Sequence, residues 1–442
     1  MHTTRSQFTN ASLLKLTHGI FKQNHADKLG QFAINTADCL MSALAMFQLK
    51  YPSLLQFDQE KRHKTLSHNL NTLYGVNMAP CDTTMRVRLD GLGLSSIRSV
   101  FQAILYRLQP GKVLERWRFL EKYYLVSLDG TQFFSSHQVH CKHCCEKNHR
   151  NGSITYHHQM VVGSMCAPGI RQVLPIGFEP IVKEDGAEKN DCERNASKRW
   201  LKEFRKQHPQ LPTVIVADGL FANDPFIEML EQHRCHYILA CKEDDHKYLW
   251  DWFWAAESLD MVAFTEIETN VTKHYRFMHN VPLNGGSDRL VTVIHIQEIH
   301  TKSEKSKRKK NDFSCGWITD LPVTPENVRE IIEGGRSRWK IENETFNTLK
   351  NQNYNFEHNY GHGFKTLSNV LAGMMLLAFL INQTLESVNV DFQRSLKYLK
   401  QRCNLWRHIQ ARFTLLCFQN WEQLYNSILD PPVVRIESVI TD

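Results

Sequence analysis

Two aspartates follow apolar segments that are typical of buried β-strands. Asp129 ends the run that begins at Tyr123, and Asp218 ends a run of β-branched residues that begins at Pro212; a glycine follows each aspartate. A strand that ends in Asp-Gly places the carboxylate on a rigid element, at the point where the strand opens. If the two strands share one sheet, neither carboxylate stays ionised cheaply without a cation between them. The pair therefore indicates binding of a divalent metal ion.

A third acidic residue, Glu342, lies in a segment with helical spacing. In residues 336–350, Trp339 and Phe346 mark one face of the expected helix. Arg338 and Glu342 are four residues apart, so both project from the same side. Two aspartates and a glutamate with flanking Arg and Lys suit a pair of hard metal ions and a phosphate backbone.

These three segments resemble a bacterial insertion-sequence transposase of the DDE type, similar to the IS-four family. That family has a ribonuclease-H-like core that carries two aspartates, a β-rich insertion, and then a helix with a Tyr-Arg-Glu-Lys signature. The resemblance covers nearly the whole chain. It implies that Asp129, Asp218 and Glu342 are the catalytic metal ligands, with Asp129 bridging the ions. It also implies that Arg338 and Lys350 bind the phosphates of the transposon ends.

The cofactor implied by this resemblance is a pair of Mg²⁺ ions, for which Mn²⁺ could substitute. Magnesium prefers hard oxygen ligands, so carboxylates rather than the nearby histidines are the expected ligands. Two such ions lower the pKa of the attacking hydroxyl and hold the leaving oxygen.

The sequence departs from the family pattern in two ways. The tyrosine of the signature, three residues before Arg338, is replaced by Gly335. The interval from Glu342 to Lys350 is one residue longer than in the family, which would turn the helix by about 100°. Glu344 is therefore a rival to Glu342. We prefer Glu342 because it follows Arg-Trp-Lys-Ile as in the family.

The function implied is cut-and-paste transposition of an insertion sequence, by two-metal-ion DNA strand cleavage and strand transfer at terminal inverted repeats. The expected partner is double-stranded DNA, as transposon ends and as target, bound by a homodimer in the bacterial cytoplasm at the nucleoid. Two alternatives stay open. One is an inactive, transposase-derived DNA-binding regulator, and the other is a metal-dependent DNA endonuclease without strand transfer.

The expected fold class is α/β, with a ribonuclease-H-like mixed sheet flanked by helices. A β-rich insertion would precede the last catalytic helix, and a helical domain would come first. Four consecutive segments are expected. Residues 1–118 would form a helical N-terminal DNA-binding domain and residues 119–248 the first part of the core. Residues 249–320 would form the β-rich insertion, and residues 321–442 the second part of the core with C-terminal helices.

Part of the N-terminal domain resembles two helices joined by a turn. Asp82 or Thr83 could cap the second helix, whose exposed face would offer Arg86 and Arg88 to DNA. Plain packing of a short helix pair is the alternative. A cationic run at residues 302–310 is either a solvated loop or a segment that follows phosphates.

Twelve cysteines without a signal peptide indicate reduced thiols in the cytoplasm. Cys141 and Cys144 have the Cys-x-x-Cys spacing of a structural zinc site, for which Cys192 and His149 are candidate partners. Unligated thiols and redox chemistry are the alternatives. We expect the histidines on either side of Gly361, at positions 358 and 362, to shape a tight turn rather than to bind metal.

The bulk composition is that of an ordinary globular protein. A net charge of +7 over 442 residues permits nucleic acid as a partner without demanding it. The most apolar segment, residues 370–381, is too short for the roughly 20 residues that span a bilayer, so we expect a buried core helix and no membrane partner. A helix that begins at Pro325 should break at Gly334 and Gly335, and Trp339 should lie in the core.

Overall fold

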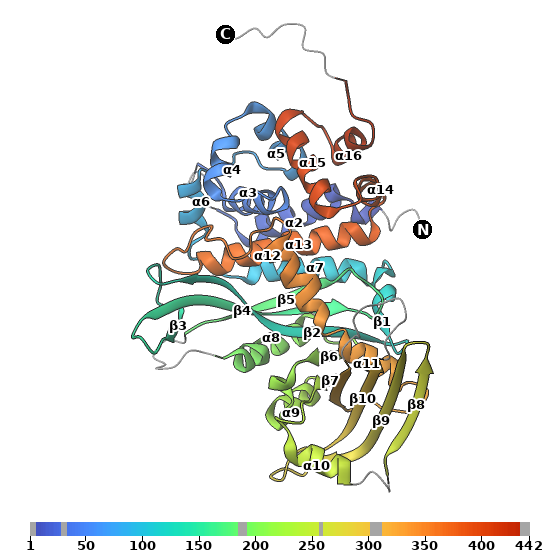
Figure 1. Cartoon of the computed structure of the whole chain (residues 1–442). Helices are drawn as coiled ribbons and strands as arrows, with labels where there is room; N and C mark the ends of the chain where they lie inside the picture. Colours follow the sequence, from blue (N-terminus) through green and yellow to red (C-terminus); the bar gives the residue numbers. More distant parts are fainter. Residues whose placement is uncertain (1–5, 28–32, 184–191, 256–259, 301–311, 434–442) are drawn as a thin grey trace, which may run out of the picture. The chain divides into compact units, whose positions relative to one another are not determined.

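In this computed structural model the described residues are 6–27, 33–183, 192–255, 260–300 and 312–433. The cationic run at residues 302–310 lies outside them. The helices and strands form a mixed α/β protein with a large mixed sheet (Figure 1).

The chain divides into two compact units, and each is built from separate stretches of sequence. Unit 1 comprises Met1–Val113, Gln132–His158 and Asn347–Asp442. Unit 2 comprises Leu114–Thr131 and Gln159–Phe346. These boundaries differ from the four consecutive segments expected above, because the C-terminal helices pack with the N-terminal helices, and because the β-rich segment extends the central sheet.

Unit 1 is mainly helical, and it also contains β3, the end of β2 and the start of β4, because both of these long strands continue from one unit into the other. Its elements before the central strands are η1 (Ser6–Phe8), α2 (Asn10–Asn24), α3 (Thr36–Gln48), α4 (Leu54–Glu60), α5 (Lys64–Tyr74), α6 (Asp82–Leu89) and α7 (Ser95–Leu108). The later elements are β3 (Cys145–Asn148), α12 (Asn347–Asn351), α13 (Leu367–Val388), α14 (Val390–Leu399), α15 (Arg402–Leu415) and α16 (Trp421–Leu429).

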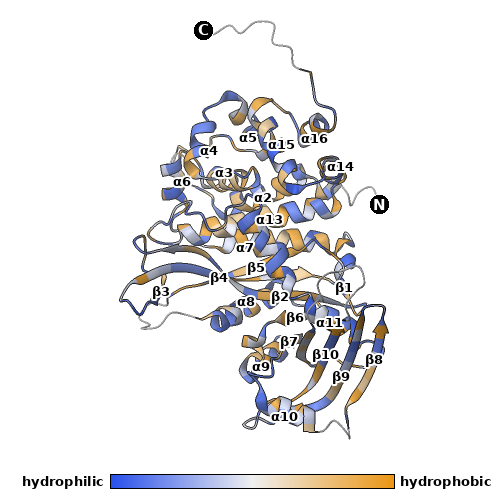
Figure 2. Ribbon diagram, in the orientation of Figure 1, coloured by the Kyte–Doolittle hydropathy of each residue, from blue (hydrophilic) through white to orange (hydrophobic). Residues whose placement is uncertain are grey.

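Two helices without a polar face, α3 and α13, form the centre of unit 1. Every residue of α3 is buried, and the apolar residues of α13 extend along its length (Figure 2). A helix that is apolar all round needs partners on all sides. Within this pair the Gln48 amide donates to Asn382 Oδ1 at 3.1 Å, which satisfies two buried polar groups.

α13 confirms the expected core helix, although it is longer than the apolar segment that suggested it. Among the described residues it is the one helix long and apolar enough to cross a membrane, and 94% of its most apolar window is buried inside the protein.

Asp90, at the end of α6, holds the start of α13. Its carboxylate accepts the backbone N–H groups of four successive residues at 2.8–3.0 Å: Phe364, Lys365, Thr366 and Leu367. Burial alone would raise the pKa of Asp90, but these four bonds lower it. The carboxylate thus satisfies donors that the first turn of a helix leaves unpaired.

We expect Asp90→Ala to lower the free energy of unfolding by about 2–4 kcal/mol at neutral pH, because charged acceptors of backbone N–H groups are lost. Since the folded-state pKa is lowered, this contribution is present above the ordinary carboxyl pKa and is lost as the pH falls through the lowered value. Denaturant unfolding at several pH values measures both the loss of stability and its dependence on pH. The control is Asp82→Ala in the same helix, where the exposed pair with Arg86 at 3.7 Å should cost under about 1 kcal/mol.

Unit 2 contains most of the sheet. Its strands are β1 (Arg118–Phe119), β2 (Tyr123–Ser136), β4 (Ile154–Cys166), β5 (Leu174–Ile181), β6 (Thr213–Ala217), β7 (Cys235–Ala240), β8 (Val262–Glu268), β9 (Val271–Pro282), β10 (Leu290–His300) and β11 (Phe313–Thr319). Its helices are η2 (Val113–Trp117), α8 (Glu193–Gln207), η3 (Gly219–Phe221), α9 (Asp224–Gln232), α10 (Lys247–Ala255), α11 (Val328–Arg336) and the π-helix η4 (Ile341–Phe346).

The strand order β4-β2-β6-β7-β11-β10-β9-β8 combines two kinds of pairing. The neighbours β2, β6 and β7 are parallel. From β7 onward each strand is antiparallel to the next, in the spatial order β7, β11, β10, β9, β8. β5 pairs with β4. The β-rich segment therefore continues the central sheet from β7 (Figure 1).

The predicted break at Gly334 and Gly335 is wrong. Both residues lie inside α11, which begins at Val328 rather than at Pro325. A Cβ on Gly334 would lie 2.7 Å from the Phe119 ring, and one on Gly335 2.6 Å from the Trp317 indole. The two glycines thus let α11 approach aromatic side chains closely, and this packing outweighs their low helix propensity.

Candidate active site

Asp129 lies inside β2, which continues to Ser136 rather than ending there as expected, and Asp218 directly follows the parallel neighbour β6. Ser127 of β2 pairs with Val216 of β6. Continuing this register by two residues places Asp129 opposite Asp218, where β6 ends. Paired strands are about 4.8 Å apart, so the structure brings the two aspartates to one edge, as the sequence predicts.

Asp218 is held in place by the turn that follows it. It is the N-cap of η3, and its Oδ1 accepts the Leu220 backbone N–H at 3.0 Å. The residues before it, Thr213–Ala217, are all buried. The buried strand before Asp218 and the capped turn after it therefore fix the position of this side chain.

Glu342 is brought to the same site by Arg338. The Arg338 guanidinium lies 2.6 Å from Glu342 Oε1 and 3.6 Å from Asp129 Oδ2, with 14% of its side chain exposed. The Ser127 hydroxyl donates to the Arg338 carbonyl at 3.0 Å, which ties this segment to β2. One cation thus lies between two of the three predicted carboxylates, which are 17% (Asp129) and 48% (Glu342) exposed.

A fourth carboxylate, which the sequence reasoning missed, belongs to this cluster. Burial first, and the Glu193 carboxylate second, raise the pKa of Asp129 to about 7, although Arg338 opposes this. Burial and then the charge of Asp218 raise the pKa of Glu193. Glu193 is the first residue of α8, and a Cβ on Gly130 would lie 2.7 Å from its carboxyl carbon. The glycine after Asp129 could have drawn attention to such a close approach.

Two of the four carboxylates line a cleft of about 1180 Å³ within unit 2. Asp218 and Glu342 line one part of it. The other lining residues come from the loop after β7, from β10, from the start of β11 and from the end of α11, and include Lys242, His295, Glu298, Arg336 and Trp339. The acidic edge of the sheet is therefore accessible to a large ligand.

The helix that carries Glu342 is a π-helix over Ile341–Phe346, not the α-helix expected. A π-turn holds one more residue than an α-turn, and such turns are frequent at functional sites. The π-helix can thus accommodate the one extra residue between Glu342 and Lys350 by which the sequence departs from the resembled pattern. Glu344, the rival to Glu342, instead pairs with Arg171 at 3.4 Å.

The predicted DNA-binding cations have different surroundings. Arg88 is 12% exposed and pairs with Asp27 at 3.1 Å, so its expected exposure to DNA is wrong. Arg88 instead forms an ion pair with the Asp27 carboxylate inside unit 1. Arg86 lies on α6 with 46% of its side chain exposed, and Lys350, in unit 1, pairs with Glu357 at 2.7 Å. The cap of α6 is Cys81, rather than either of the expected residues.

Trp339 does not lie in the core as predicted. It is 58% exposed and lines the cleft. The regular helical spacing that suggested burial is interrupted because Ser337 and Arg338 form a turn, and because a π-helix begins at Ile341.

The Cys-x-x-Cys motif is close to two histidines that were not predicted as its partners. Cys141 and Cys144 lie with His158 and His362, all in unit 1. His149 instead hydrogen-bonds Thr155 Oγ1 at 2.7 Å, and Cys192 precedes α8 in unit 2. His362, which we expected to shape a tight turn, has its Nε2 3.2 Å from Cys144 Sγ.

Residues 177–381 match the family model of the transposase DDE domain. The matched segment includes Asp218 and Glu342, and the match supports a DDE transposase. No curated protein matches the chain. Among solved structures the chain is similar to piggyBac transposase in a cryo-EM structure of its synaptic complex with hairpin DNA. The sequence identity is 11%, the TM-score is 0.41, and the alignment covers 98% of this chain and 84% of that chain.

Proposed function

We propose that the protein is a DDE transposase of the IS-four type, which cleaves DNA strands at terminal inverted repeats and joins them to a target. The observation that carries the proposal is the convergence of Asp129, Asp218 and Glu342, from two parallel strands and a π-helix, at one edge of the sheet. The strand order β5-β4-β2-β6-β7, with β2, β6 and β7 parallel, supports a ribonuclease-H-like core.

The residues at this edge fit a pair of Mg²⁺ ions, with Mn²⁺ as a substitute. Their donors are carboxylate oxygens, which are the ligands that Mg²⁺ prefers. Burial, and then the nearby Glu193 carboxylate, raise the pKa of Asp129, so that a cation beside it would favour the ionised form. Asp129, Asp218 and Glu342 would hold the ions, which supply Lewis-acid activation of the attacking hydroxyl and charge neutralisation at the leaving oxygen.

The chain's own side chains would prepare the site for DNA. Arg338 forms ion pairs with Asp129 and Glu342. With both carboxylates holding metal ions, its guanidinium would be available for a bidentate phosphate contact. Trp339, exposed in the cleft, offers a flat apolar surface on which a base could stack.

The proposed partner is double-stranded DNA, both as transposon ends and as target, with a homodimer holding two ends in the bacterial cytoplasm at the nucleoid. Arg86 and Lys350 would add phosphate contacts from unit 1, where each side chain is partly exposed. Such contacts stabilise binding without reading sequence.

The test is incubation of the purified protein with DNA that carries the inverted repeats flanking its gene, with Mg²⁺ or with EDTA. We expect Mg²⁺-dependent cleavage at the repeat ends and products in which those ends are joined to target DNA. Equal cleavage of random DNA without joined products would instead indicate an endonuclease. Binding of the repeats without cleavage in Mg²⁺ or Mn²⁺ would indicate a regulator, and either result overturns the proposal.

A further inference from the structure

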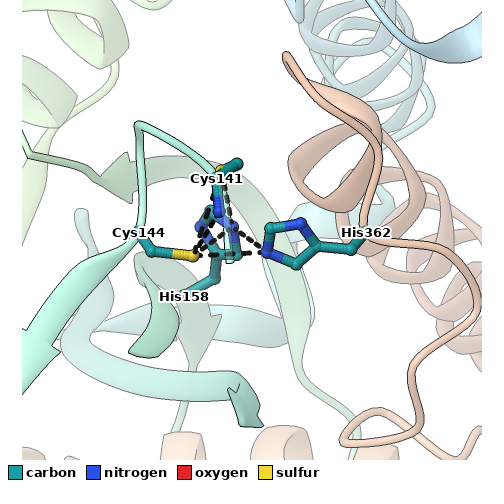
Figure 3. Close-up of side chains that lie close together, drawn as sticks. All are labelled: Cys141, Cys144, His158 and His362. Atoms are coloured by element: carbon teal, nitrogen blue, oxygen red, sulfur yellow. Dashed lines mark hydrogen bonds between the residues drawn. The ribbon is translucent and has the colours of Figure 1, made fainter. Parts of the chain in front are cut away.

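Four side chains with metal-binding atoms meet in unit 1 (Figure 3), whereas the carboxylates described above belong to unit 2. Cys141 and Cys144 come from the turn before β3, His158 from β4, and His362 from the loop between α12 and α13. One ligand atom of each lies within 4.8 Å of all the others. The cluster joins segments that are more than 200 residues apart, since Cys144 and His362 are 218 positions apart.

Five of the six distances between these atoms match those around a tetrahedral zinc ion, and the sixth, from Cys141 Sγ to His362 Nε2, is at most 4.8 Å. With Zn–S of about 2.3 Å and Zn–N of about 2.05 Å, a tetrahedron places S···S at about 3.8 Å, S···N at about 3.6 Å and N···N at about 3.3 Å. The two sulfurs are 3.9 Å apart. The sulfurs lie 3.6 Å (Cys141) and 3.5 Å (Cys144) from His158 Nε2, and Cys144 Sγ lies 3.2 Å from His362 Nε2. The two Nε2 atoms are 3.2 Å apart.

The orientation of both imidazoles suits metal binding through Nε2. His362 Nδ1 lies 3.1 Å from the Gly363 carbonyl, to which an Nδ1–H donates; Nε2 then carries the lone pair that faces the cluster. The His158 ring is stacked on Phe133 at 5.9 Å between ring centroids and lies near Phe134. Ring packing thus fixes the second imidazole.

The Cys-x-x-Cys turn also has the local geometry of a zinc-binding loop. The backbone N–H of Cys144 donates to the Cys141 carbonyl at 3.2 Å, which closes the turn. The backbone N–H of Cys141 points to Cys144 Sγ at 3.5 Å. An N–H directed at sulfur stabilises a thiolate, which is the form that binds metal.

We propose that Cys141, Cys144, His158 and His362 bind one zinc ion in a closed, structural site. Two thiolates and two imidazoles in a tetrahedron are the donor set of structural zinc. Three of the four residues are buried, and their donor atoms converge. A disulfide between the cysteines would require the sulfurs to approach to about 2.05 Å.

The site would fasten the loop that leads into α13. His362 lies between Gly361 and Gly363, both with positive φ. The next residues, from Phe364, are bound by Asp90, as described above. Zinc on one side and Asp90 on the other would therefore fix this loop to β4 and to the turn before β3, so that loss of zinc destabilises unit 1.

The first experiment measures zinc in the untagged, full-length protein by inductively coupled plasma mass spectrometry after dialysis against EDTA. We expect close to one zinc per chain in the wild type, and loss of most of it in Cys144→Ser and in His362→Gln. The matched controls are the sequence neighbours Cys145→Ser and His157→Gln, which should retain zinc. His157 and His158 project to opposite faces of β4, because side chains alternate along a strand.

A second measurement serves in case a variant fails to fold. Cobalt(II) exchanged into the wild-type protein should give the intense visible absorption of tetrahedral coordination, together with thiolate charge-transfer bands. Release of the metal by a mercurial should lower the melting temperature of the wild-type protein. A wild type without zinc, with Cys141 and Cys144 either free to alkylate or joined in a disulfide, would overturn the proposal. Equal loss of zinc in the controls would also overturn it.

The two proposals fail separately. Asp218→Asn should retain zinc in full, because its carboxylate belongs to unit 2 and not to the cluster. Zinc content and cobalt absorption do not depend on DNA cleavage. The zinc proposal can therefore be tested even if the protein does not cleave DNA.

Discussion

Glu342→Gln lowers Mg²⁺-dependent DNA cleavage by at least about a thousandfold, whereas Glu344→Gln stays within about threefold of the wild type. Glu342 lines the cleft with Asp218 and binds Arg338, while Glu344 pairs with Arg171. Metal ions stabilise the transition state by several kcal/mol, and each 1.4 kcal/mol is tenfold in rate. Losing one ligand carboxylate therefore removes several powers of ten.

The measurement is single-turnover cleavage of a labelled repeat end, with DNA binding and the melting temperature measured alongside. Binding should be retained in both variants, since the carboxylates repel phosphate rather than attract it. If Glu344→Gln shows the larger loss of cleavage, or if both variants cleave like the wild type, Glu342 is not the third metal ligand.

Gly163→Ala is expected to lower the free energy of unfolding of unit 2 by about 3 kcal/mol, at the upper end of the cost of overpacking a core. A Cβ at this position would lie 2.0 Å from Trp200 Cζ2. Gly163 pairs with Gly177 across β4 and β5, and together they form a flat surface against the buried indole. Trp200 lies on α8, which begins at Glu193. Displacing the indole therefore also displaces a carboxylate of the active site.

Denaturant unfolding measures this loss, and Gly19→Ala is the control. Gly19 lies inside α2, and a Cβ there would have no described atom within 4 Å outside its own helix backbone, so alanine should stabilise by about 0.5–1 kcal/mol. Trp200→Leu should partly rescue Gly163→Ala, since the smaller side chain removes the clash. Additive losses in the double variant would show that the indole is not what makes Gly163 necessary.

The parts of the site that lie on single strands could be predicted from the sequence. The apolar runs before Asp129 and Asp218 correctly predicted strands β2 and β6, but only β6 ends at its aspartate, since β2 continues through Asp129 to Ser136. Arg338 and Glu342 were also predicted to project together, because residues four apart in a helix share a side. Their 2.6 Å contact agrees with this, although Arg338 lies in a turn and Glu342 in a π-helix.

The remaining features depend on distant partners that no local pattern shows. His158 and His362 are 204 positions apart, so their spacing carries no metal-binding signature. Gly334 and Gly335 look like a helix break until Phe119 and Trp317 supply the aromatic surfaces that require them. Arg88 looked exposed because Asp27, its partner, lies 61 positions away. Glu193 was missed because it opens a helix outside the three motifs.

The discontinuous make-up of unit 1 also bears on how the chain emerges from the ribosome. α3 is buried on every side, and its Gln48 bonds Asn382 on α13, 334 positions later. At the usual 5–20 residues per second, the apolar faces of α3 wait roughly 17–67 s for that partner. During synthesis the first helices therefore need a chaperone or temporary contacts with one another. A message truncated before α13 would yield a product prone to aggregate.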